Sequence, residues 1–302
     1  MSEASARVLR TPESAFKNLP EFPFRPHYQS VDGGELGALR MAYIDEGSGP
    51  VILCLHGEPS WSFLYRKMIP IFVAAGYRVL APDLVGFGRS DKPAAIGDYS
   101  YQRHLDWLAA WFHALELSDV TLVAQDWGGL LGLRLLAENC DSFARFSLSN
   151  TMLPTGDHAP PEAFLAWRQF SLDDPDFDIG LICNELGSGN LSVAEQAAFR
   201  APFPDDHYKA GARAFPALVP TDPDNPASAA NRSAWDVLRR WEKPALMCFS
   251  DQDPITRGGD KVFCSQVPGC EGQPHQTLNG GHFVQNYDGE RWASAIVEWS
   301  SV

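Results

Sequence analysis

The sequence predicts an α/β fold in which a mostly parallel central sheet carries helices on both faces and a helical cap is inserted late in the chain. Short apolar, β-branched runs alternate with segments of helical periodicity from residue 51 to residue 150, as repeated β–α units do. The alternation stops between residues 155 and 230, where only helical patterns occur, and it resumes afterwards. A chain of 302 residues is also long enough to bury a large core.

The predicted strands are apolar runs bounded by glycine, proline or charged residues. Residues 51–55 are wholly apolar, which is typical of a strand inside a parallel sheet. We expect strands at residues 39–45, 51–55, 77–82, 120–125, 143–150, 245–249 and 275–278. Because such sheets bind ligands at the carboxyl ends of their strands, functional side chains should follow the strand ends.

The predicted helices fall into two groups. The core helices are expected at residues 62–75, 101–115, 130–136, 231–241 and 259–267, with a last one from residue 288. The cap helices are expected at residues 161–170, 192–200 and 206–214, separated by proline, glycine and aspartate. We therefore divide the chain into a core domain of residues 1–154 and 231–302 and a cap domain of residues 155–230. Residues 221–226 form the return hinge, for which a flexible interdomain linker is the alternative.

The stretch 120–129 organises the rest of the chain, because it predicts a buried strand, a sharp turn and a buried helix. Such an elbow lifts a nucleophile above the sheet, and here the turn holds Asp126. Ala124 and Gly128 flank the turn, where closely approaching backbones need small residues. The alternative is that Asp126 only caps the helix that follows.

A nucleophile at the elbow needs a base and an orienting acid, in the chain order nucleophile, acid, histidine. His282 is the candidate base, because it lies in a glycine loop after the last predicted strand. Asp251 and Asp253 both follow the preceding strand. We favour Asp253, since the acid must extend past the turn and Pro254 fixes its backbone, whereas Asp251 is an ordinary turn residue. The other histidines are expected on the surface or on a helix face (His27, His104, His113, His158, His207, His275) or in the loop beside the oxyanion site (His56).

Together these residues resemble the haloalkane dehalogenases of the α/β-hydrolase superfamily, in the branch with a glutamate in the His-Gly-Glu-Pro motif of residues 56–59 and a cap tryptophan for halide. The resemblance covers most of the chain and includes residues 56–70, 83–93, 125–129, 164–167, 201–205, 215–216 and 280–285. The elbow and the His-Gly-Glu-Pro loop are shared with epoxide hydrolases. The cap segments make the match specific.

The resemblance implies that Asp126 displaces halide from a short haloalkane and forms an alkyl ester. His282, held by Asp253, then activates the water that hydrolyses the ester to an alcohol. Backbone N–H groups of Glu58 and Trp127 would hold the oxyanion. A carboxylate nucleophile suits displacement at saturated carbon, whereas serine would suit acyl transfer.

A departing halide needs hydrogen-bond donors in a dry pocket, and indole N–H groups are such donors. Trp127 supplies one beside the nucleophile. Because an ionised Glu58 can only accept, Trp167 of the cap is expected to supply the second. The alternative is that Trp167 is an ordinary core aromatic residue of a cap helix.

Apolar side chains are expected to line the substrate pocket, and they would select haloalkyl chains over polar substrates. The resemblance assigns this role to Phe164, Phe215, Pro216 and Val219. Leu130 stands where the best-known relatives carry phenylalanine, so it should change the shape of the pocket.

Three other functions are weighed against this one. An epoxide hydrolase uses cap tyrosines as donors, but Tyr208 is the only tyrosine in the cap span. A fluoroacetate dehalogenase needs cations for its substrate, and no arginine stands directly after Asp126. A non-catalytic receptor of the hydrolase fold is disfavoured because candidates for the nucleophile, acid and base are all present.

Composition limits the partners and the location. The net charge of −14 repels phosphate backbones, so we expect no nucleic-acid partner. No basic cluster or apolar run of transmembrane length occurs, and residues 1–7 lack an apolar signal core. We therefore expect a cytoplasmic monomer that does not associate with membranes, with a haloalkane, a halide ion and water as its partners.

The chain contains no pattern that predicts a cofactor. Its six cysteines show no C-x-x-C or zinc-finger spacing, and several lie in apolar runs, so buried free thiols are expected. No histidine, aspartate and cysteine cluster has ligand spacing, and no phosphate-binding loop occurs. We expect neither a metal nor an organic cofactor.

Overall fold

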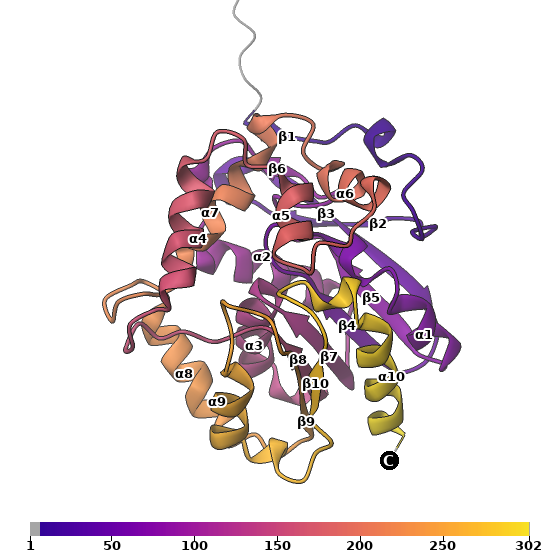
Figure 1. The fold of residues 1–302 in the computed structure, drawn as a ribbon, viewed down its shortest axis with the longest axis vertical. Coiled ribbons are helices and arrows are strands. Elements are labelled where there is room, and N and C mark those ends of the chain that lie inside the picture. Colours follow the sequence, from indigo (N-terminus) through magenta and orange to yellow (C-terminus); the bar gives the residue numbers. More distant parts are fainter. Residues whose placement is uncertain (1–6, 302) are drawn as a thin grey trace, which may run out of the picture.

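The computed structural model describes residues 7–301, and its centre is an eight-stranded sheet with the order β10-β9-β8-β7-β4-β5-β3-β2 (Figure 1). The strands are β2 (His27–Asp32), β3 (Ala38–Gly47), β4 (Val51–Leu55), β5 (Arg78–Pro82), β7 (Val120–Gln125), β8 (Phe143–Ser149), β9 (Ala245–Ser250) and β10 (Gln276–Leu278). In the order of the sheet, the strands β10, β9, β8, β7, β4 and β5 each pair in parallel with the next one. At the other edge, β3 pairs antiparallel with both β5 and β2. The predicted mostly parallel sheet is confirmed.

Helices cover both faces of this sheet. Helices α1 (Ile69–Ala74) and α10 (Gly289–Ser300) pack against each other. Helix α3 (Trp127–Glu138) packs against both α2 (Tyr101–Ala114) and α8 (Ser228–Leu238). Helix α9 (Gly259–Gln266) follows β9 and contacts it. Strands β4 and β7 are wholly buried between these layers, as their continuous apolar sequences predict.

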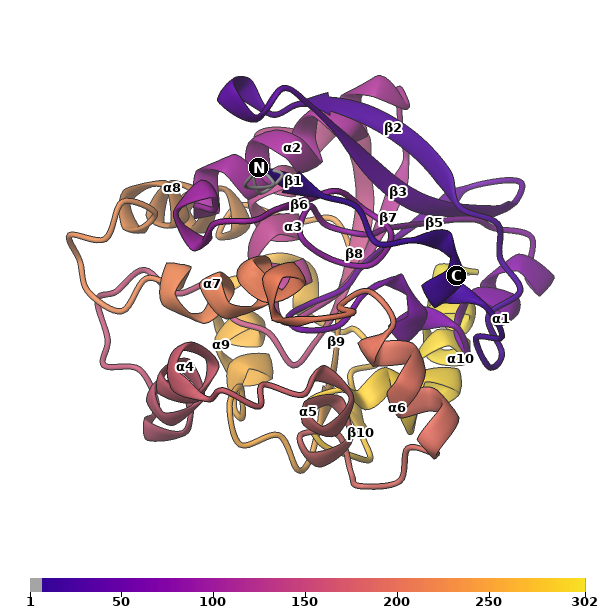
Figure 2. The same cartoon turned by 90° about the horizontal axis from the view of Figure 1, so that it is seen from above.

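Five α-helices lie between β8 and β9 in the chain, and the first four of them form the cap above the sheet in Figure 1. These four are α4 (Glu162–Asp173), α5 (Ile179–Glu185), α6 (Val193–Arg200) and α7 (Ala210–Leu218). Figure 2 looks down on this end, where α4 packs against α7 and α5 against α6. The exact borders of the cap stay a prediction, and α8, which packs on α3 of the core, already begins at Ser228.

Several elements differ from the sequence prediction. The edge strand β2 and a small antiparallel sheet of β1 (Val8–Leu9) and β6 (Lys92–Pro93) were not predicted. The helix expected at residues 62–75 is a 3₁₀ turn at Ser62–Tyr65 followed by α1. Pro70 explains this break, because proline lacks the N–H that a helix interior needs and starts a new helix well.

The cap also differs in two places. Helix α5 was missed because proline and aspartates precede it, although Asp178 caps it by accepting a hydrogen bond from the Leu181 N–H. The helix expected at residues 206–214 is a 3₁₀ turn, Asp206–Lys209, that leads into α7. Within residues 7–301, no helix is long and apolar enough to cross a membrane. Residues 1–7, which were searched for a signal sequence, lie outside the described residues except for residue 7.

Candidate active site

Asp126 stands in the turn between β7 and α3, with a positive φ of 52° that non-glycine residues rarely adopt. A Cβ on Gly57 would meet the Asp126 Oδ1 at 2.3 Å, and one on Gly128 would meet the Leu55 carbonyl at 2.0 Å. Glycine is therefore required at both places for the turn to close. The Asp126 side chain makes no capping bond to α3, so the reading of Asp126 as a simple helix cap is wrong.

The two carboxylate oxygens of Asp126 have different partners. Oδ1 accepts a hydrogen bond from the Glu58 backbone N–H at 2.8 Å. Oδ2 lies 3.3 Å from the His282 Nε2. The Trp127 backbone N–H, the second donor expected for the oxyanion, makes no bond to this carboxylate among the hydrogen bonds of the described residues. The arrangement leaves one oxygen anchored and the other facing the histidine.

His282 lies between two carboxylates, because its Nδ1 is also 3.0 Å from the Asp253 Oδ2. Asp253 is held in turn by the Ile255 N–H at 2.9 Å and by the Thr256 hydroxyl. Asp251 instead accepts a bond from the Gly280 N–H at 3.3 Å. The structure thus brings Asp253, and not Asp251, to the histidine.

The ionisable groups of the site are strongly coupled. Burial opposes the charge on His282, but Asp253 and Asp126 outweigh it and raise the pKa of His282 to about 10. Burial also opposes ionisation of Asp253, yet the His282 charge and the hydrogen bonds lower the pKa of Asp253 to about 2. While Asp126 is charged, His282 and Asp253 therefore favour the ion pair of an imidazolium and a carboxylate.

The environment of Glu58 disfavours the ionised form that the sequence analysis assumed. Its side chain is buried, and the Oε1 has no hydrogen-bond partner in the described part of the chain. Burial, and then the nearby Asp126 charge, hold the pKa of Glu58 well above its usual range, against the opposite effects of His282 and the Trp167 indole. Only the ionised form of this carboxyl is restricted to accepting, because its protonated form, which burial favours, can donate as well.

Trp127 and Trp167 both face a cavity of about 550 Å³ that also contains Asp126, Glu58 and His282. Four of the eight buried tryptophans use their indole N–H within the protein: Trp61, Trp235, Trp292 and Trp299 each donate to an internal acceptor. Trp127 makes no such bond in residues 7–301. Trp167 is held in α4 by ring contacts with Phe170 and Phe177, at centroid distances of 5.7 and 5.9 Å. Both indoles are thus placed at the cavity.

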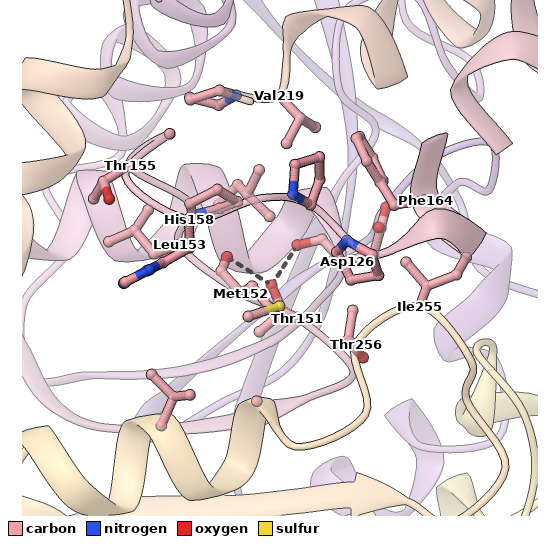
Figure 3. Close-up of a pocket in the computed structure, with 18 of the residues that line it drawn as sticks. Asp126, Thr151, Met152, Leu153, Thr155, His158, Phe164, Val219, Ile255 and Thr256 are labelled. Carbon is pink, nitrogen blue, oxygen red and sulfur yellow. Dashed lines mark hydrogen bonds between the residues drawn. The ribbon is translucent and has the colours of Figure 1, made fainter. Parts of the chain in front are cut away.

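Figure 3 shows the cavity around Asp126, with the cap residues Phe164 and Val219 on one side and Leu153, Ile255 and Thr256 on others. Pro216 and Leu130 also line it, as expected. Sequence reasoning missed Ile255 and Thr256, although they directly follow Asp253 and Pro254. It also missed Thr151, whose hydroxyl donates to the Asp126 carbonyl at 2.7 Å.

Phe215 was expected to line the pocket, and this is wrong. Its side chain is fully buried and lies behind Trp127, with the two rings stacked at 4.3 Å and 27°. On its other side it stacks on His104 at 4.2 Å. His104 lies on the inner face of α2, where burial lowers its pKa to about 3. Phe215 therefore supports the ring of Trp127 and does not form the wall.

The cysteines are free, but not all are buried. Cys264 is exposed and Cys140 is half-buried, because both lie near helix ends at the surface. The ligand atoms of Cys264, Cys270 and His275 lie within 4.8 Å of one another. However, the His275 Nδ1 accepts from the Met247 N–H at 3.0 Å, so the Nε2 that faces the cysteines carries the proton. A protonated nitrogen cannot bind a metal, and this arrangement does not form a metal site.

Comparisons with known proteins agree with this geometry. The profile of the alpha/beta hydrolase fold family matches residues 50–288. A haloalkane dehalogenase from Psychrobacter cryohalolentis is 54% identical over 300 residues, which cover 97% of this chain and 98% of that protein. One from Mycolicibacterium paratuberculosis is 51% identical, with 97% and 98% covered. The solved structure of a tetrameric haloalkane dehalogenase from Paraglaciecola agarilytica has a TM-score of 0.88 at 38% identity, and covers 95% of this chain and 96% of that one.

Proposed function

The chain belongs to the haloalkane dehalogenases of the alpha/beta hydrolase fold, and from this premise we propose that it cleaves short haloalkanes through an alkyl ester on Asp126. The chain is thus a hydrolase that acts on carbon–halogen bonds. The observation that carries the proposed mechanism is the unequal environment of the two Asp126 oxygens, with Oδ1 on the Glu58 N–H and Oδ2 towards His282.

In the first step, Oδ2 attacks the carbon that bears the halogen. The new C–O bond forms as the carbon–halogen bond breaks, and the bonding electrons leave with the halide ion. Oδ1 then becomes the carbonyl oxygen of the ester. It already accepts from the Glu58 N–H, so the donor is in place for the charge that develops when water later attacks the carbonyl carbon.

Ester formation also prepares His282 for the second step. The alkylated Asp126 no longer carries a negative charge, so one of the two carboxylates that raise the pKa of His282 is lost. The imidazole can then release its proton to the solvent and accept one from the water that attacks the carbonyl carbon. When the tetrahedral intermediate collapses, the bond from this carbon to the alkyl-bearing oxygen breaks, and that oxygen takes a proton from His282 and leaves as the alcohol. The carboxyl proton of the regenerated Asp126 returns to His282. Asp253, which stays ionised, orients the ring and stabilises the imidazolium that forms. The products are an alcohol, a halide ion and a proton.

Trp127 and Trp167 are the proposed donors to the departing halide. Their indole N–H groups offer hydrogen bonds without an acceptor lone pair, in a cavity whose cap wall includes the apolar side chains of Phe164, Pro216 and Val219. Tyr208, the one tyrosine of the cap span, does not line the cavity. The tyrosine donors that an epoxide hydrolase needs are therefore lacking among the described lining residues.

A halide-release assay tests the proposed function directly. We expect halide from a panel of short chloro- and bromoalkanes, because the proposed mechanism needs only a halogen on an accessible saturated carbon. Styrene oxide serves as the control substrate and should not be hydrolysed. Turnover of styrene oxide without halide release from any haloalkane would refute the proposal.

Replacing Trp167 with phenylalanine should weaken halide binding while an aromatic ring still occupies the position of the indole. A hydrogen bond to a charged group contributes about 1.5–3 kcal/mol, so the Kd for bromide should rise about ten- to hundredfold. Bromide titration by calorimetry measures this without relying on the lost fluorophore. Trp241→Phe is the matched control, because Trp241 does not line this cavity. An unchanged Kd would remove Trp167 from the halide site.

We propose a cytoplasmic location, supported by six free cysteines, since reduced thiols persist in that compartment. We also propose that the chain acts as a monomer. The relative from Paraglaciecola agarilytica is a tetramer, and gel filtration with light scattering would decide between the two states.

A further inference from the structure

The cavity at the active site is much larger than a short haloalkane. Its volume is about 550 Å³. If each heavy atom of a ligand takes roughly the space of one water molecule, about 30 Å³, a substrate of four heavy atoms fills only about a fifth of it. Most of the cavity is therefore left for a longer molecule.

The cavity reaches from Asp126 to side chains of both α8 and α9. Gly259, Val262, Phe263 and Gln266 line it from α9. From the first to the last of these, the helix advances seven residues, or about 10 Å at 1.5 Å per residue. An elongated alkyl chain whose halogen lies at Trp127 would follow this direction.

The wall of this distal part is rigid. Trp235 of α8 donates its indole N–H to the Leu153 carbonyl at 2.8 Å. Its ring stacks on Phe263 at 5.4 Å and 23°, and the Arg239 guanidinium lies 5.7 Å from its centroid. These contacts leave Trp235 only 6% and Phe263 only 1% exposed, so they hold the wall of the distal part in one shape and limit the side-chain entropy that binding would cost.

The rim offers an oriented amide. The Gln266 Oε1 accepts from both the Nε and the Nη2 of Arg239, at 3.1 and 3.0 Å. Because a guanidinium can only donate, these two hydrogen bonds identify the atom facing Arg239 as the amide oxygen. The Nε2 group of Gln266 therefore remains free to donate elsewhere. Gln266 can therefore bind a hydrogen-bond acceptor at the far end of a substrate.

The charges at the rim are already paired. Arg239 also donates to Asp236 at 3.2 Å. Arg232 donates to both oxygens of Asp157, at 2.9 and 2.6 Å. With these cations neutralised and a net charge of −14, the rim does not favour an anionic end group. A neutral acceptor, such as a hydroxyl or ether oxygen, matches it best.

We propose that Trp235, Arg239, Val262, Phe263 and Gln266 form a distal subsite for the far end of an elongated haloalkane, in which Gln266 selects a neutral hydrogen-bond acceptor. The inference rests on the proposed function and names a substrate class for the same site. It assigns chain-length selectivity to Val262 and end-group selectivity to Gln266, two residues that do not touch the reacting atoms.

The first experiment compares ethyl bromide with octyl bromide in the Val262→Trp variant. Filling the distal part should remove contacts with the long chain, and each buried methylene contributes about fourfold to binding. We therefore expect kcat/KM for octyl bromide to fall at least about tenfold, while that for ethyl bromide stays unchanged. Val193→Trp, at an exposed site of α6, is the matched control. An equal fall in kcat/KM for both substrates would show that this region is only a passage to the site. An unchanged kcat/KM for both would show that substrates do not use it. Both results overturn the proposal.

The second experiment uses the Gln266→Leu variant with octyl bromide and the bromoalcohol of the same length whose hydroxyl is at the far end. Loss of one neutral hydrogen bond should lower kcat/KM for the bromoalcohol about three- to tenfold and leave octyl bromide unaffected. Gln102→Leu, an exposed residue of α2, is the control. A wild-type protein that does not prefer the bromoalcohol to its bromoacid counterpart would contradict the selectivity. Failure of the function itself would look different, because ethyl bromide would then release no bromide in any variant.

Discussion

The His282→Phe variant should release one halide ion per active site and then stop, with the alkyl group of the substrate attached to Asp126. The reason is that the first step uses only the carboxylate, whereas hydrolysis of the ester needs a base. General-base catalysis contributes about 10²–10⁴-fold, so steady-state turnover should fall by about that factor. Mass spectrometry of the intact protein after a brominated substrate should show the mass increase, and peptide mapping should place it on Asp126.

The control for this result is the Asp126→Asn variant treated with the same substrate. It should show neither a burst of halide nor a mass increase, because the amide oxygen is a poor nucleophile. A His282→Phe protein that gains no mass, or that gains it at a residue other than Asp126, would contradict the ester mechanism.

The Asp253→Asn variant should lose activity by about 10²–10⁴-fold. The amide removes the charge that stabilises the His282 imidazolium, and it no longer fixes the proton on Nδ1. Asp251→Asn is the matched control two residues away. Its side chain only accepts a weak bond from the Gly280 N–H, which an amide oxygen can also accept, so halide release should be nearly unchanged. The reverse ranking of the two variants would move the acid to Asp251.

Much of the fold could be predicted because its signals are local. The apolar run of β4 and the elbow at Asp126 appear in the sequence as continuous patterns, and the structure places them where those patterns begin and end. The edge strand β2 could not be predicted, because most of its side chains are exposed and carry no apolar alternation. The helix predicted at residues 62–75 is longer than α1, because the prediction followed the apolar periodicity and did not allow for Pro70.

The site could be predicted less completely, because its geometry depends on contacts between distant segments. The sequence favoured Asp253 from a turn argument, and only the packing of two loops brings it to His282. Phe215 was misplaced because a resemblance identifies a segment near the pocket but does not tell which of its side chains meets the cavity. The elevated pKa of Glu58 arises from burial and from the nearby Asp126 charge, which no local pattern records. The distal compartment between α8 and α9 is likewise a property of tertiary packing.

The stack of His104 and Phe215 behind Trp127 has a consequence for how such an enzyme can adapt. The position of one halide donor is set from behind by α2 and by α7, two segments separated by about a hundred residues in the chain. Selection for a different leaving group therefore has sites available on the hidden side of the cavity wall. Exchanges there can retune anion affinity while every surface that the substrate meets stays chemically the same.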